Sequence, residues 1–221
     1  MVKNSIELSP SILGADASAL GDAVLQIKNA GLKWVHLDIM DAHFVPNLSF
    51  GPAVLASLKK RHPDMFYDVH LMMDNPHLYI DAFANAGAGS ITVHTEPDYP
   101  IHETLQEIHL KGCKVGITIK PKTSVYDLCP FLPFVDMVLL MSVEPGFGGQ
   151  SFMEGSYERI AAVAKMREEA KLNFRIEIDG GITGENVGKC IEHGVDTIVA
   201  GTEFFKHGDA LLAVIAPYLK A

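Results

Sequence analysis

The sequence predicts an α/β protein, a single domain of residues 1–221 folded as a (β/α)8 TIM barrel, and three observations lead to this prediction. Strand-like apolar runs alternate with amphipathic helical segments along the whole chain, which indicates a parallel sheet. Eight such strand–helix units can be recognised, which favours a closed barrel over an open, doubly wound sheet. No linker or composition break divides the 221 residues, a length above the lower limit of roughly 200 residues for this fold.

The first half of the chain contains four of the units. A serine–proline pair follows the first strand, apolar–polar alternation marks the second and third strands, and glycines end several of the helices. The expected strands are residues 6–8, 35–39, 65–71 and 90–93, and the helices that follow them are residues 17–30, 52–61, 76–86 and 102–111.

The second half contains the other four units. The continuous apolar run MVLLM is typical of a buried parallel strand, and Thr123 is expected to cap a short helix after the fifth strand. The expected strands are residues 114–119, 137–141, 175–178 and 197–200, and helices are expected at residues 153–170, 185–193 and 210–219.

Composition excludes several classes of protein. With 27 acidic and 18 basic residues the formal net charge is −9, so binding to nucleic acid or to an anionic membrane is not expected. No apolar run is long enough to span a bilayer, and the N-terminal residues lack a secretory signal, so we expect a cytoplasmic location. Cys113, Cys129 and Cys190 are odd in number and widely spaced, which argues against disulfides and thiolate metal sites.

Residues 34–50 carry the first chemical signal. Alternation along the strand places His36 and Asp38 on one face, and the turn formers and proline that follow predict a loop at the strand's C-terminal end. A lone His-x-Asp pair is weak evidence, because buried histidines and strand-end aspartates are commonly structural. In a barrel, however, the C-terminal strand ends converge on one rim, which would gather Ser9, His36, Asp38, His70, Ser142, Asp179 and Gly201.

Two imidazoles and two carboxylates in this group could hold one divalent metal ion. His36, Asp38, His70 and Asp179 suit Zn²⁺, Fe²⁺, Mn²⁺ or Co²⁺, and ligand type does not choose among these four ions. His70 alone could be a core histidine and Asp179 a turn former. Clustered together, four ionisable groups would be costly to desolvate without a compensating charge.

Glycine-rich loops follow the last three strands and form a second candidate site. Glycine loops expose backbone N–H groups that can hold a phosphate, which would let an acidic protein bind an anionic ligand. Any one of these loops could be a simple tight turn, and the spacing does not fit a dinucleotide-binding fingerprint. The loops contain Gly146, Phe147, Gly148, Gly149, Gly180, Gly181, Gly201 and Thr202.

Methionines also occur at or just beyond strand ends. Methionine there usually packs the rim of the barrel, and the alternative is an apolar lining that excludes water from a reactive carbanion. The residues concerned are Met40, Met72 and Met141.

Several long motifs, in order through nearly the whole chain, resemble the ribulose-phosphate 3-epimerase family. They are SPSIL from Ser9, HLDIMD from His36 with HFVPN from His43, VHLM from Val69, MSVEPGFGGQ from Met141, EIDGGI from Glu177, and Gly201-Thr202.

The resemblance implies a metal-dependent isomerase of the pentose phosphate pathway that interconverts ribulose 5-phosphate and xylulose 5-phosphate. It implies that His36, Asp38, His70 and Asp179 bind one divalent metal, that Asp38 accepts and Asp179 donates a proton, and that Ser9 and His70 contact the substrate. The glycine loops would hold its phosphate, and a homo-oligomer, a dimer or larger, is expected. Two departures stand out, because the family commonly has glycine at Ala42 and serine at Thr202.

The proposed chemistry suits these residues independently of the resemblance. Epimerisation at C3 of a 2-ketose phosphate removes a proton next to a ketone and returns one to the opposite face, through an enediolate that two carboxylates and a metal could serve. Three rivals stay open at this point: 3-epimerisation of another ketose phosphate such as allulose 6-phosphate, metal-dependent hydrolysis, and mere binding of a sugar phosphate.

Overall fold

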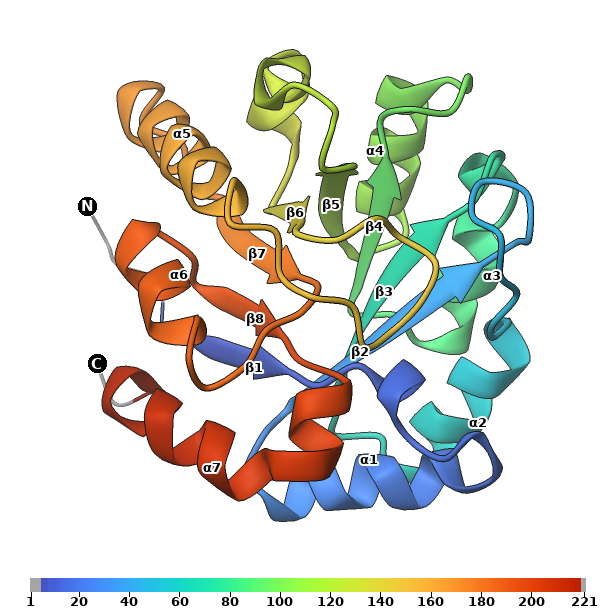
Figure 1. The fold of residues 1–221 in the computed structure, drawn as a ribbon. Coiled ribbons are helices and arrows are strands. Elements are labelled where there is room, and N and C mark those ends of the chain that lie inside the picture. The colour runs from blue at the N-terminus through green and yellow to red at the C-terminus, as the bar shows by residue number, and fades with distance from the viewer. Residues whose placement is uncertain (1–4, 220–221) are drawn as a thin grey trace.

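A computed structural model describes residues 5–219; residues 1–4 and 220–221, at the ends of the range expected for the domain, lie outside the described residues. Eight parallel strands form one sheet in the order β1-β8-β7-β6-β5-β4-β3-β2, with helices around it (Figure 1). The strands are β1 Glu7–Ser9, β2 Trp34–Met40, β3 Phe66–Met72, β4 Ser90–His94, β5 Lys114–Ile119, β6 Met137–Met141, β7 Arg175–Asp179 and β8 Thr197–Val199.

The sheet closes between β1 and β2, just after β1 ends. The N–H of His36 donates to the carbonyl of Pro10 at 3.0 Å, and Ser11 forms a parallel bridge with His36. These contacts complete the (β/α)8 barrel that the alternating pattern predicts, and closure brings the C-terminal ends of all eight strands to one rim.

Within residues 5–219, seven α-helices cover the barrel. They are α1 Leu20–Asn29, α2 Pro52–Arg61, α3 Ile80–Ala86, α4 Ile101–Leu110, α5 Ser156–Glu169, α6 Val187–His193 and α7 Thr202–Leu219. Between β5 and β6, all of which lies in the described part of the chain, there is no α-helix, and two 3-10 turns, Val125–Leu128 and Leu132–Phe134, make the crossover instead. Ser124, rather than Thr123, caps the first of these turns by accepting a hydrogen bond from Tyr126 N–H.

Several helices differ from the sequence expectation at their beginnings. The segment expected as a helix over residues 17–30 begins as a 3-10 turn, Ala17–Ala19, before α1, and α5 begins at Ser156 rather than at residue 153. The segment expected as a helix over residues 76–86 begins as a 3-10 turn, Pro76–Leu78, and continues as α3 after Tyr79. The last helix begins at Thr202 rather than at residue 210, with a kink at His207, whose φ and ψ are non-helical. The early start matters because it places a helix N-terminus directly after Gly201, at the rim.

The strands divide their side chains between two environments. Outward-facing apolar residues such as Leu37, Val69 and Ile91 join the main core between sheet and helices, and all three are fully buried. The inward face of β2 and β3 is polar below and apolar at the rim, because the register pairs His36 with Asp68, Asp38 with His70 and Met40 with Met72. Because successive side chains of a strand point to opposite faces, the outward-facing residues pack the core under the helices and the inward-facing residues form the polar interior of the barrel.

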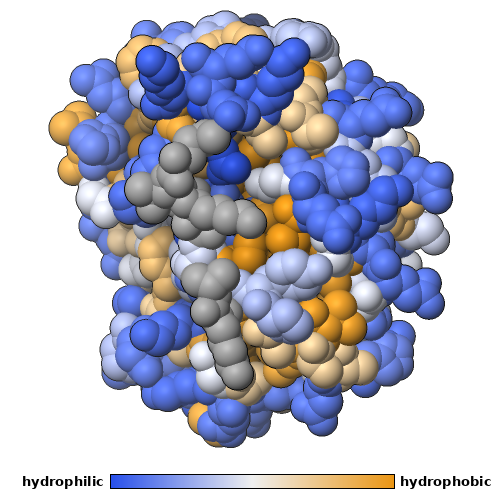
Figure 2. All heavy atoms as spheres, turned by 90° about the vertical axis from the view of Figure 1, so that its left-hand side faces the viewer, coloured by the Kyte–Doolittle hydropathy of each residue, from blue (hydrophilic) through white to orange (hydrophobic). Residues whose placement is uncertain are grey.

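The outer surface is built from the polar faces of the helices. On the side of the barrel where both ends of the chain emerge, hydrophilic residues predominate and hydrophobic ones gather near the centre of the view (Figure 2). Across residues 5–219, no helix combines the length and apolar character that crossing a membrane requires.

The loop after β2 contains a strained residue. Ala42 has φ 61°, in the left-handed region, and its N–H donates to the carbonyl of Asn47 at 2.9 Å. The carboxylate of Asp41 accepts from the N–H groups of His43, Phe44 and Asp74, which holds the turn in place. The departure from glycine at position 42 therefore leaves a cost of roughly 1–2 kcal/mol in the loop beside the rim.

Replacing Ala42 by glycine should relieve this strain. Because glycine also gains freedom in the unfolded chain, we expect the free energy of unfolding to change by between about 0 and +1 kcal/mol. The matched control is Ala56→Gly in the exposed interior of α2, which should lose roughly 0.5–1 kcal/mol. Urea unfolding of both variants measures the difference, and equal losses would contradict the strain at Ala42.

Candidate active site

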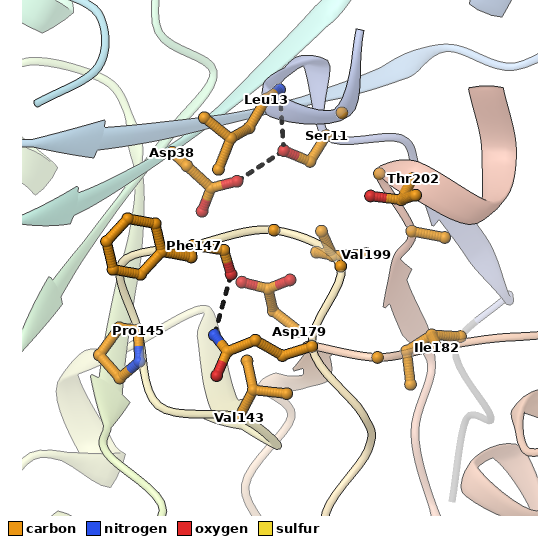
Figure 3. A pocket seen from close by; sticks show the side chains of 18 of the residues that line it. Ser11, Leu13, Asp38, Val143, Pro145, Phe147, Asp179, Ile182, Val199 and Thr202 are labelled. Carbon is orange, nitrogen blue, oxygen red and sulfur yellow. Dashed lines mark hydrogen bonds between the residues drawn. The ribbon is translucent and has the colours of Figure 1, made fainter. Parts of the chain in front are cut away.

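A cavity of about 410 Å³ opens at the rim, at the C-terminal ends of the strands. Strand ends supply its floor, and the loops after β6, β7 and β8 form its walls (Figure 3). Thirteen residues predicted from the sequence line it: Asp38, Met40, Met72, Met141, Gly146, Phe147, Gly148, Gly149, Asp179, Gly180, Gly181, Gly201 and Thr202. Asp38 and Asp179 reach the cavity from β2 and β7 (Figure 3).

The four residues expected to bind a metal lie together. His36, Asp38, His70 and Asp179 each offer a ligand atom, and these atoms are all within 4.8 Å of one another. Asp38 Oδ1 is 3.4 Å from His36 Nε2 and 3.4 Å from His70 Nδ1. Three separate strands thus deliver one set of donors that could hold a metal ion.

The imidazole nitrogens give a direct test of whether this set fits a cation. Among buried side-chain atoms of the described residues, His36 Nε2 and His70 Nδ1 have no hydrogen-bond partner, although the other nitrogen of each ring has one. A buried polar atom without a partner is costly, and here both atoms face a carboxylate oxygen. The arrangement fits a cation placed among the four side chains, with neutral imidazoles and carboxylates as its ligands.

Asp38 lies in an environment that favours its charged form. Burial raises the pKa of this carboxyl group, but its interactions with His36 and then with His70 outweigh burial and hold the pKa well below its usual range. Ser11 adds a further donor, because its hydroxyl donates to Asp38 Oδ2 at 2.5 Å. Asp38 is therefore a carboxylate at neutral pH.

Asp179 lies in the opposite kind of environment. Burial, and then repulsion from the charge of Asp38, raise the pKa of Asp179 to about 7, and attraction to His36 offsets only part of this. The carbonyl of Asp179 accepts hydrogen bonds from both the N–H and the hydroxyl of Ser142, at 2.8 Å each, which fixes the end of β7. Two aspartates on one cavity thus differ in protonation, as an acid and a base must.

The structure places Ser9, the serine expected to contact substrate, away from the cavity. Ser9 is the last residue of β1, and its side chain is fully buried and absent from the cavity lining. Ser11 lines the cavity instead, two residues further along the chain and so closer to the rim. The sequence contains both serines on either side of Pro10, and only the position of the strand end distinguishes them.

His70 also lies behind the cavity rather than on its surface. Its side chain is fully buried and does not line the cavity, so the expectation that it contacts substrate directly is not supported by its position. Asp38 and Met72, which neighbour His70 in the sheet, do line the cavity. His70 can act on the site only through a group bound to Nδ1.

Close backbone approach explains two of the glycines around the cavity. A Cβ on Gly181, which has φ +63°, would lie 2.3 Å from the backbone N of Phe152, and a Cβ on Gly14 would lie 2.6 Å from Thr202 N. Helix α7 begins at Thr202, so its first N–H groups lie at this wall. Exposed N–H groups of a helix start and glycine loops are suited to an anionic group.

Sequence reasoning missed the side chains that support the ligands. Asp68 Oδ2 accepts a hydrogen bond from His36 Nδ1 at 2.8 Å, and Ser90 donates to Asp68 Oδ1 at 2.6 Å. Glu177 is fully buried beside this pair, where burial and the charge of Asp68 raise its pKa well above the usual range. A period-two reading of β7 would have found Glu177, because it shares a face with Asp179.

Comparisons with known proteins point to one family. The model of the Ribulose-phosphate 3 epimerase family matches residues 7–205. A ribulose-phosphate 3-epimerase of Treponema pallidum is 42% identical over 204 residues, covering 92% of this chain and 93% of that protein. A chloroplastic ribulose-5-phosphate-3-epimerase of Arabidopsis thaliana is 41% identical over 214 residues, covering 96% of this chain and 76% of that protein.

Solved structures bear on the fold alone. A mutant tryptophan synthase alpha-subunit from Pyrococcus furiosus superposes with a TM-score of 0.69 and covers 100% of this chain and 99% of that one. Its sequence identity is 14%, so the likeness supports the barrel architecture and carries nothing about chemistry.

The raised pKa of Asp179 predicts a pH-dependent stability of the metal-free protein. Between about pH 4 and pH 7 the folded chain keeps a proton that an unfolded aspartate has released, so stability is lost as pH rises through this interval. Asp179→Asn removes the titration, so the variant should gain stability relative to the wild type on going from pH 5 to pH 8, by about 1.4 kcal/mol for each pH unit between pH 5 and pH 7. Urea unfolding in chelator at both pH values measures this gain, and a constant difference would refute the raised pKa.

Proposed function

The chain belongs to the ribulose-phosphate 3-epimerase family and is an isomerase, and from this premise we propose that it interconverts D-ribulose 5-phosphate and D-xylulose 5-phosphate. The observation that carries the proposal is the pair of aspartates, Asp38 ionised and Asp179 with a pKa of about 7, that reach one cavity from different strands. Inversion at a carbon next to a ketone requires such a pair, with one group removing a proton and the other returning one to the opposite face.

Four residues would hold a divalent metal ion in this reaction: His36, Asp38, His70 and Asp179. When bound, such an ion would act as a Lewis acid toward the negative charge that develops on the substrate's C2 and C3 oxygens. Candidate ions are Zn²⁺, Fe²⁺, Mn²⁺ and Co²⁺, which this mixture of imidazole and carboxylate donors accepts without a strong preference.

The proton transfers fall to the two aspartates. Asp38, the charged member, accepts the C3 proton of ribulose 5-phosphate, and Ser11 orients its carboxylate through the hydrogen bond to Oδ2. Asp179, whose pKa burial and the charge of Asp38 raise to about 7 in the metal-free chain, donates to the other face of the planar enediolate. In the reverse direction the two roles exchange, as microscopic reversibility requires.

Other parts of the cavity bind and enclose the substrate. Met40, Met72 and Met141 form an apolar surface next to the aspartates that would keep water from the carbanion. On the far wall, the loops around Gly146–Gly149, Gly180, Gly181 and Gly201 offer backbone N–H groups for the phosphate. This arrangement accounts for phosphate binding by a chain whose net charge is −9.

A 3-epimerase of another ketose phosphate, such as allulose 6-phosphate, is the alternative within the same mechanism. It would use the same aspartates and ligands and differ only in how far the phosphate lies from the reacting carbon. Substrate comparison therefore separates the two.

The direct test is conversion of ribulose 5-phosphate to xylulose 5-phosphate by the purified protein. We expect kcat/KM to exceed that for allulose 6-phosphate by at least about tenfold and that for unphosphorylated ribulose by far more, because the phosphate contacts contribute binding energy. Elemental analysis should find about one transition-metal ion per chain, and strong chelation should abolish turnover. Comparable kcat/KM for free ribulose, or full activity without metal, would overturn the corresponding part of the proposal.

The two-base mechanism predicts a specific isotope result. In D₂O, a single turnover should place solvent deuterium at C3 of the product, because the proton that one aspartate removes is not the proton that the other delivers. Asp38→Asn and Asp179→Asn should each lower kcat by roughly 10²–10⁴-fold. Metal content must be measured in both variants, since each aspartate is also a proposed ligand. Transfer of the substrate's own C3 hydrogen to the inverted product would instead indicate one shuttling group.

A further inference from the structure

Behind the cavity, three side chains form a hydrogen-bonded row that leads away from His70. His70 Nε2 lies 2.9 Å from Nε2 of His94, the last residue of β4, and His94 Nδ1 lies 3.0 Å from Glu96 Oε2. Both histidines are fully buried, and their rings stack with centroids 5.0 Å apart. Only His70 reaches the candidate metal site, so the other two residues can act only through it.

Glu96 determines which atom donates in each hydrogen bond of the row. Its Oε1 accepts hydrogen bonds from the N–H of Lys120 and from the hydroxyl of Thr123, both at 2.6 Å. Burial would raise the pKa of Glu96, but its interactions with His94, Thr123 and Lys120 lower it to about 2. Glu96 is therefore a carboxylate that can only accept, so the proton of the Glu96–His94 hydrogen bond resides on His94 Nδ1.

The position of the proton on His94 in turn determines the position of the proton on His70. His94 is fully buried, and burial disfavours a charged ring, so an imidazole that holds its proton on Nδ1 toward Glu96 has a free lone pair on Nε2. That lone pair must accept from His70, which places the proton of His70 on Nε2. The other nitrogen of His70, Nδ1, is then left bare, and it is this atom that lacks a hydrogen-bond partner and lies 3.4 Å from Asp38 Oδ1.

We propose that Glu96 and His94 are positioning residues that fix His70 in the tautomer with a proton on Nε2, so that Nδ1 is free to bind a metal. The proposal rests on the metal site of the proposed function, and it adds two residues outside the cavity that determine whether one ligand can bind. Metal-binding histidines commonly have such a partner on the second nitrogen. Here the partner is a neutral histidine, whose own tautomer must in turn be held by a carboxylate.

The second imidazole ligand provides an internal control. His36 donates from Nδ1 to Asp68 at 2.8 Å, on a different strand from His94. A change at Glu96 should therefore alter His70 and leave His36 as it is.

Glu96→Gln is a near-isosteric change that should reverse the direction of donation in both hydrogen bonds of the row. The two donors at Oε1 require an acceptor, so the amide oxygen of the glutamine takes that place and its NH₂ group faces His94 Nδ1. His94 must then accept on Nδ1 and carry its proton on Nε2, which forces His70 to accept on Nε2 and to carry a proton on Nδ1. The expected loss of affinity for Zn²⁺ or Co²⁺ is about 10–100-fold, measured by competition with a chromogenic chelator.

Thr123→Val is the matched control. It removes one hydrogen bond from the same carboxylate but leaves Glu96 an acceptor, so metal affinity should stay within about twofold of the wild type. If this variant loses as much affinity as Glu96→Gln, the effect is loss of local structure rather than reversal of the row, and the proposal fails.

The tautomers can be read directly, without metal or turnover. Long-range ¹H–¹⁵N correlation spectra of the metal-free, ¹⁵N-histidine-labelled protein should show His70 protonated on Nε2 in the wild type and on Nδ1 in Glu96→Gln, with the His36 signals unchanged. His70 protonated on Nδ1 in the wild type overturns the proposal even if the variant does not fold. A wild-type protein that binds none of Zn²⁺, Co²⁺, Fe²⁺ and Mn²⁺ removes the metal from the proposed function, while the spectra still decide the tautomer.

Discussion

The burial of ionisable side chains inside a closed barrel is the constraint on which the rest of the site depends. His36, Asp38, Asp68, His70 and Glu177 are each at most 4% exposed. Groups of this kind are stable in a low-dielectric interior only when their charges and lone pairs are matched. Asp68 accepts a hydrogen bond from His36 Nδ1 and another from the hydroxyl of Ser90. Burial and the charge of Asp68 favour the neutral form of Glu177. The two imidazole nitrogens without a hydrogen-bond partner, His36 Nε2 and His70 Nδ1, both face Asp38, which lines the cavity.

Burial in the barrel also gives two aspartates, Asp38 and Asp179, different protonation states. Asp38 accepts a hydrogen bond from Ser11 and lies beside the imidazole rings of His36 and His70, whereas Asp179 faces the charge of Asp38. Burial first, and then the negative charge of Asp38, favour the protonated form of Asp179, so the two aspartates differ because of their surroundings. A barrel achieves this easily, because strands far apart in sequence end at one rim and only their inward-facing residues meet there.

The sequence predicted the parts of the structure that follow from period and order. Alternation along β2 and β3 identifies His36, Asp38 and His70, and the count of strand–helix units implies that Asp179 joins them. The misses arise where a local choice depends on tertiary contacts. Ser9 and Ser11 cannot be distinguished until the end of β1 is known, and no sequence period shows that two 3-10 turns replace a helix after β5. The row from His70 to Glu96 was also missed, because its members come from two strands and a loop.

The two halves of the barrel contribute different kinds of group to the cavity. The N-terminal half supplies side chains fixed within long strands: β2 and β3, seven residues each, provide His36, Asp38 and His70. The C-terminal half supplies mainly backbone, through the glycines that follow β6, β7 and β8. Asp179 lies at the boundary, as the last residue of β7 and directly before Gly180 and Gly181. One turn therefore carries both the proposed acid and part of the proposed phosphate site. Because the turn fixes the distance between them, it also limits how many carbons a ketose phosphate can have between its reacting centre and its phosphate.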